Sequence, residues 1–63
     1  MRKMQVIVRI NKIDFSAVNT GENAREAANK CLAEIQQLIY NELGIMPCDK
    51  TLRLRIRVCK VLI

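Results

Sequence analysis

The sequence predicts a small two-layer α/β (α+β) protein in which a helix packs on a sheet, in the order strand, helix, strand. Apolar residues alternate with polar ones near both ends of the chain, and they recur every three or four residues in the middle. The length of 63 residues fits one domain, 1–63. The apolar content of 51% excludes an intrinsically disordered chain.

The first predicted strand covers residues 3–13. The even-numbered positions are the apolar residues Met4, Val6, Val8 and Ile10. The odd-numbered positions are the polar residues Lys3, Gln5, Arg9 and Asn11, with the apolar Ile7 as the exception. Alternation over eight residues, rich in β-branched side chains, is typical of a strand with one buried face. The even-numbered residues should therefore face the core.

A long amphipathic helix is predicted over residues 22–43. Its apolar stripe consists of Ala24, Ala27, Ala28, Cys31, Leu32, Ile35, Leu38, Ile39 and Leu43, at spacings of three and four. Asn23 with Glu26 forms a candidate capping box, and Thr20 is a competing cap. Gly44 suits the left-handed position after a helix, and Pro47 prevents continuation.

The second predicted strand covers residues 51–63. Leu52, Leu54, Ile56 and Val58 alternate strictly with Arg53, Arg55 and Arg57. After Val58 the alternation reverses, because the charged Lys60 occupies a position where an apolar residue is expected. Either a β-bulge shifts the register there, or both faces of the strand are covered.

A helix between two strands returns the chain to its starting end, so the two strands should be parallel. Two strands leave two open edges, and a chain this short is marginally stable alone. We therefore expect a homodimer, or a larger assembly, in which dimerisation completes a four-stranded sheet with two helices on one face. The apolar residues Val61, Leu62 and Ile63 are predicted to lie in the subunit contact.

Several classes of chemistry are disfavoured by composition. Without histidine, the chain lacks the commonest general base and the commonest metal ligand. Cys31, Cys48 and Cys59 are too scattered for a metal site or a disulfide framework. Since no apolar run exceeds three residues and no secretory signal is evident, we expect a cytoplasmic protein with no membrane partner. We also expect no cofactor and no catalysis.

The net charge of +5 is unevenly distributed. The helix segment has two cations against four carboxylates, whereas the strand segments are basic. The alternation along the two predicted strands places their cations on one sheet face opposite the helix, formed by Lys3, Arg9, Arg53, Arg55 and Arg57. Three interpretations stay open: binding of nucleic acid or another polyanion, docking on an acidic protein, or a solvated face that prevents aggregation.

Overall fold

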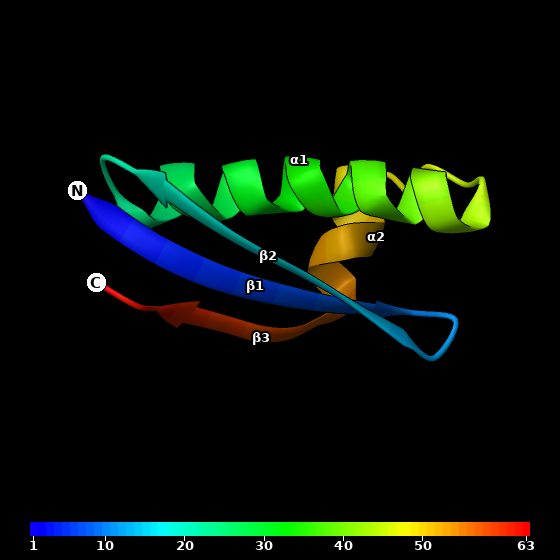
Figure 1. Ribbon diagram of the computed structural model, residues 1–63. Coiled ribbons are helices and arrows are strands. Elements are labelled where there is room, and N and C mark those ends of the chain that lie inside the picture. The colour runs from blue at the N-terminus through cyan, green and yellow to red at the C-terminus, as the bar shows by residue number, and fades with distance from the viewer.

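The computed structural model describes residues 1–63 as a three-stranded sheet with two helices on one face (Figure 1). Along the chain the elements are β1 (Arg2–Ile10), β2 (Ile13–Gly21), α1 (Ala24–Leu43), α2 (Asp49–Leu54) and β3 (Ile56–Val61). The strand order is β2-β1-β3, and both strand pairs are antiparallel. The predicted two-layer α+β class is confirmed.

β1 and β2 form a hairpin that the sequence pattern does not predict. Asn11 and Lys12 both have positive φ, at 51° and 65°, which is the backbone of a two-residue type I′ turn. The buried positions of β2 include Phe15 and Ala17, and its open side includes Val18. A small residue inside and an apolar one outside blur the alternation, so the pattern alone does not reveal β2.

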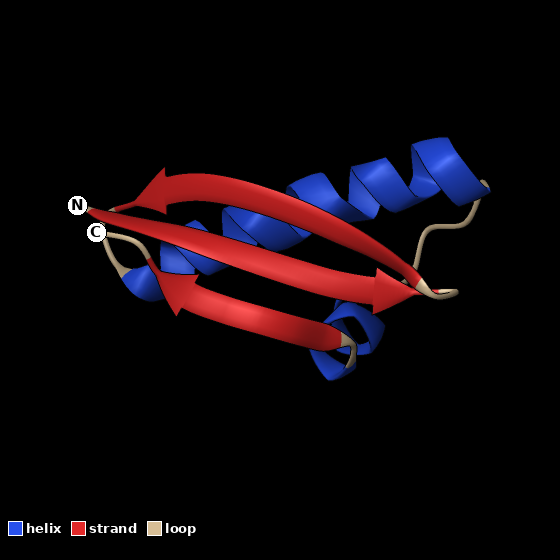
Figure 2. Ribbon diagram, turned by 60° about the horizontal axis from the view of Figure 1, so that its bottom comes forward, coloured by secondary structure: helices blue, strands red, loops and turns tan.

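The predicted parallel pairing of the outer segments is wrong, and the hairpin is the reason. β2 has already returned the chain to the starting end before α1 begins. α1 then leads the chain to the opposite end, and β3 runs back antiparallel to β1 (Figure 2). The chain therefore supplies three strands rather than two, and a four-stranded dimer that counts two strands per chain no longer follows.

The predicted helix is confirmed, with the predicted Asn23 at its beginning and Gly44 at its end, although the Glu26 carboxylate faces Lys30 and does not complete the capping box. The Asn23 side-chain oxygen accepts a hydrogen bond from the Glu26 backbone N–H at 2.9 Å, so Asn23 is the cap. Gly44 has φ 72°, and its N–H donates to the Tyr40 carbonyl at 2.8 Å. The buried side of the helix includes Ile35 and Ile39.

The predicted strand over 51–63 is wrong in its first part, where residues 49–54 form α2. Leu52 is buried at 1% exposure, whereas Leu54 is 76% exposed. In a helix, residues two apart lie on different faces, so only one of the two leucines reaches the core. Asp49 and Arg53, four residues apart, form an ion pair that favours the helix.

β3 contains a β-bulge, which is one of the two explanations that we expected for its interrupted alternation. Ile7 of β1 pairs with Val58, and Val8 pairs with Ile56, so Arg57 is the extra residue. Because paired residues share a sheet face, Val58 and Lys60 lie on the face opposite the helices. The bulge comes just before Val58, not after it, and Lys60 does not face the core.

The core lies between the sheet and the helices and contains one aromatic residue, Phe15. It consists of Met4, Val6, Val8, Ile10, Phe15, Ala17, Ala27, Cys31, Leu32, Ile35, Ile39 and Leu52. α1 packs on β2 and β1 (Figure 2), while Cys59 and Val61 of β3 stay exposed on the helix side. Neither helix combines the length and apolar composition needed to cross a bilayer.

Candidate polyanion-binding face

The sheet surface opposite the helices, here called the open face, carries most of the candidate site. It comprises Lys3, Gln5, Ile7 and Arg9 of β1, Asp14, Ser16, Val18 and Thr20 of β2, and Val58 and Lys60 of β3. The odd-numbered residues of β1 lie on this face, and their pairing partners on β2 and β3 lie there too, because paired residues share a face of the sheet. None of these side chains is fully buried.

The structure brings together some of the predicted cationic residues and separates one. Lys3 and Arg9 lie on the open face, as predicted. Arg57 lies beside Arg9 at the bulge of β3, and Arg55 directly follows α2. Arg53 belongs to α2, on the helix side of the sheet, so its predicted place on the cationic face is wrong.

Arg53 holds the two helices together. Its Nε donates to Asp49 Oδ2 at 2.7 Å, and its Nη2 donates to Asn29 Oδ1 of α1 at 2.8 Å. Two of its donor groups are thus already engaged with this chain. The arrangement assigns Arg53 a role in seating α2 against α1.

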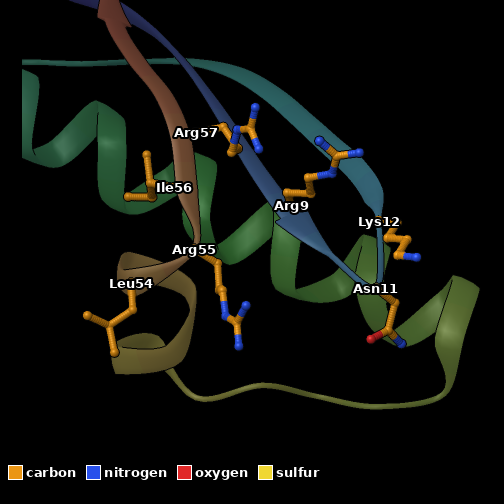
Figure 3. A pocket seen from close by; sticks show the side chains of 7 residues that line it. All are labelled: Arg9, Asn11, Lys12, Leu54, Arg55, Ile56 and Arg57. Carbon is orange, nitrogen blue, oxygen red and sulfur yellow. The ribbon is translucent and has the colours of Figure 1, made fainter.

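Four cations gather at the hairpin end of the sheet around a shallow hollow of about 320 Å³ (Figure 3). The hollow is lined by Arg9, Asn11, Lys12, Leu54, Arg55, Ile56 and Arg57. We call Arg9, Lys12, Arg55 and Arg57 the basic cluster. Arg9 projects from β1, Lys12 from the hairpin turn, Arg55 from the turn between α2 and β3, and Arg57 from the beginning of β3 (Figure 3).

The basic cluster is only partly neutralised. Arg9 Nε lies 3.7 Å from Asp14 Oδ1, its register partner on β2. Asp14 of β2 therefore offsets the positive charge of the cationic face at this one position. Lys12, Arg55 and Arg57 form no ion pair. The cluster carries a net excess of three positive charges at an exposed surface.

Backbone contacts fix the cluster in place. The Arg9 N–H donates to the Arg55 carbonyl at 3.1 Å, which continues the β1–β3 pairing into the end of α2. The bulge at Arg57 then places two consecutive residues of β3 opposite Val8. A bulge often redirects a side chain, and here it brings Arg57 to the same hollow as Arg9.

A second, smaller group of cations lies at the other end of the open face. Lys60 pairs with Gln5, and Lys3 lies two residues before Gln5 on β1. Lys12 and Lys60 were both absent from the predicted site. Lys60 was missed because the bulge reverses its parity, and Lys12 because the hairpin turn was not recognised; the Asn11-Lys12 dipeptide between apolar runs was the available clue.

The three thiols are free and differ in their environments. Burial, and then the nearby Glu34 carboxylate, raise the pKa of the Cys31 thiol. Cys48 is exposed, and hydrogen bonding to Thr51 lowers its pKa. Cys59 is exposed on the uncovered helix side of β3.

None of the thiols lines the hollow of the basic cluster, and neither does any carboxylate. The chemistry available there is that of cationic and amide hydrogen-bond donors. No family model, curated protein or solved structure matches this chain.

Proposed function

We propose that the protein is a non-catalytic binding protein that holds a polyanion, most simply nucleic acid, on its open face. The observation that carries this proposal is the basic cluster, in which four cations surround one hollow and only Arg9 has a carboxylate partner, Asp14. Arg55 and Arg57 have their guanidinium groups free for a ligand. The planar guanidinium fork matches the oxygens of a phosphate.

Electrostatics support a ligand with several charges. Like charges held close together repel, and a polyanion relieves the repulsion while it releases its own counterions. The cations are exposed, so they lose little hydration when a solvated phosphate backbone binds. Their affinity for nucleic acid should therefore depend steeply on salt.

The test compares two variants that each lose one positive charge. Arg57→Gln should weaken binding to a mixed-sequence DNA duplex and reduce the slope of log affinity against log salt by about 1, the loss of one phosphate contact. Arg53→Gln should leave the slope unchanged, because Arg53 is occupied by Asp49 and Asn29. Equal losses in both variants, or no loss in Arg57→Gln, would refute the role of the basic cluster.

Docking on an acidic protein is the second candidate function. The middle of the open face carries Ile7, Val18 and Val58, and an apolar centre with a charged rim is the usual composition of a protein interface. If the protein binds neither DNA nor RNA at low salt, this candidate replaces the first.

We also propose that two copies associate through the free edge of β3. Val61, Leu62 and Ile63 are 52%, 42% and 70% exposed in the single chain. The Leu62 N–H donates to the Lys3 carbonyl at 2.7 Å, so its backbone faces β1. Since backbone groups alternate along an antiparallel strand, those of Cys59 and Val61 face the free edge.

The alternation restricts how two β3 strands can pair. A two-fold axis at Cys59 places Lys60 opposite Val58 of the partner subunit, which avoids two facing lysines. The two Cys59 residues then form a hydrogen-bonded pair with Cα atoms about 5.5 Å apart, within the range of a disulfide. Pairing by this edge joins the open faces of both copies into one surface.

Sedimentation and cross-linking test this association. The native chain should sediment as a dimer at micromolar concentration, and Val61→Asp should dissociate it without removing a backbone hydrogen bond. Mild oxidation should cross-link Cys48→Ser and leave Cys48→Ser/Cys59→Ser uncross-linked. A stable folded monomer of 7.2 kDa would refute the dimer.

A further inference from the structure

We infer that the polyanion is a DNA duplex and that the open face lies across its major groove. The inference rests on the proposed function and specifies its ligand. It is carried by the distribution of charge along β1, where cations stand at both ends of the open face and neutral side chains lie between them. Phosphate contacts position a protein on DNA, while contacts to base edges read the sequence.

The two cationic ends are separated by more than the width of the groove. Lys3 and Arg9 are six residues apart on β1, which corresponds to roughly 20 Å at about 3.4 Å per residue. Lys60 adds to the first end, and Arg57 adds to the second. The major groove is about 12 Å wide. The cations can therefore reach the phosphate backbones on both sides of the groove while the middle of the sheet lies over the bases.

The middle of the open face has the side chains that base edges require. Gln5 can bond to adenine through two hydrogen bonds, Ser16 can bond to several bases, and the methyl groups of Val18 suit the methyl group of thymine. Gln5 Nε2 donates to Ser16 Oγ over 3.4 Å, the one hydrogen bond of this amide. A hydrogen bond of that length is weak, so replacing it with a hydrogen bond to a base costs little free energy.

Other nucleic acids fit this face less well. Single strands are held largely by stacking on aromatic rings, but Phe15 is buried in the core and Tyr40 is on α1. The major groove of an RNA duplex is deep and narrow, so side chains on a sheet cannot reach its base edges. The open face therefore favours B-form DNA.

The first experiment measures affinity for three probes at one salt concentration. These are a mixed-sequence DNA duplex, one of its strands alone, and an RNA duplex of the same sequence. The DNA duplex should bind roughly tenfold more tightly than either of the others, which corresponds to about 1.4 kcal/mol. Equal or weaker binding of the DNA duplex would overturn this inference and leave the proposed function standing. Failure to bind all three would overturn both.

The second experiment separates base reading from phosphate contact. From a pool of randomised duplexes, the native protein should enrich particular sequences. Gln5→Ala should reduce discrimination at one position about tenfold with an unchanged salt slope. Lys3→Gln should weaken binding to all sequences equally and reduce the slope by about 1.

A control guards against loss of fold, because Gln5 lies in the central strand. Gln5→Glu keeps the shape of the side chain and should also alter the preferred sequence. An unchanged preference in both Gln5 variants, or no preference in the native protein, would overturn the placement of this residue over the bases.

Discussion

The thiol of Cys48 and the hydroxyl of Thr51 lie 3.3 Å apart at the beginning of α2. A hydroxyl that donates to sulfur stabilises the thiolate, and this contact is the main cause of the lowered pKa of Cys48. The thiolate is the reactive form of cysteine. Cys48 should therefore react at a lower pH than an ordinary exposed thiol.

The alkylation rate of Cys48 tests this contact. In the native protein, the rate should reach half its maximum below the usual pH for a thiol. Thr51→Val removes the hydroxyl donor and should move the midpoint to higher pH, whereas Thr20→Val, on β2, should not move it. Cys31 should react only on unfolding, because it is buried. Equal midpoints for the native protein and Thr51→Val would contradict the assignment.

The two glycines are required for different reasons. A Cβ atom on Gly21 would lie 2.6 Å from the backbone nitrogen of Ala27, so this glycine permits β2 to pass close to α1. A Cβ atom on Gly44 would meet nothing within 4 Å, but its φ of 72° is unfavourable for other residues.

Chemical denaturation of the two alanine variants separates crowding from backbone strain. Gly44→Ala should lower the free energy of unfolding by about 1 kcal/mol. Gly21→Ala should cost more, about 1–3 kcal/mol, because backbone must move. A Gly21→Ala variant as stable as the native protein would show that the close approach is not a constraint.

At the scale of elements, α2 departs most clearly from the sequence pattern. A strand over residues 51–63 would direct Leu52 and Leu54 to the same face, whereas the helix buries only Leu52. The two leucines differ in burial although they have the same chemistry and almost the same position. They therefore report directly on the conformation of this segment.

Alanine substitution at each leucine tests the helix. Leu52→Ala should destabilise the protein by about 2–5 kcal/mol, which is comparable to the roughly 3–5 kcal/mol that a core of this size supplies. Leu54→Ala should change stability by less than about 0.5 kcal/mol. Similar losses from both substitutions, measured by urea denaturation, would indicate that the segment is a strand.

The sequence predicts elements well where periodicity and end signals agree. α1 has a long apolar stripe, an Asn23 cap and a terminal Gly44, and its limits lie within two residues of the prediction. In contrast, four alternating residues at 51–54 fit a strand or a short helix. The local Asp49–Arg53 ion pair and tertiary contacts, such as that of Arg53 with Asn29, decide between them.

Prediction of the candidate site depends on the same choice between a strand and a helix for residues 51–54. Lys3 and Arg9 were placed correctly because β1 is regular along its length. The predicted place of Arg53 is wrong because the alternation predicts a strand where α2 forms, and Lys60 is absent from the predicted site because the bulge at Arg57 reverses the alternation that follows. A bulge shifts every later side chain to the other face, and alternation alone does not locate it.

At the scale of the whole molecule, the positive charge is concentrated in the sheet, because the strands carry five cations against one carboxylate whereas the two helices together carry four of each. α1 holds three of the six Asp and Glu residues, Glu26, Glu34 and Glu42, whereas cations gather around the sheet and the hairpin end. Such a separation of charge orients a molecule in the field of a polyanion, so that the basic side approaches first. The net charge of +5 adds a general attraction.

The measurement that tests the central claim most directly is an amide NMR titration of the protein with a short DNA duplex at low salt. The proposed binding face predicts the largest shift changes at Lys3, Arg9, Arg57 and Lys60, and little change along the outer side of α1. Changes confined to α1, or no changes at saturating DNA, would contradict a polyanion-binding role for the open face.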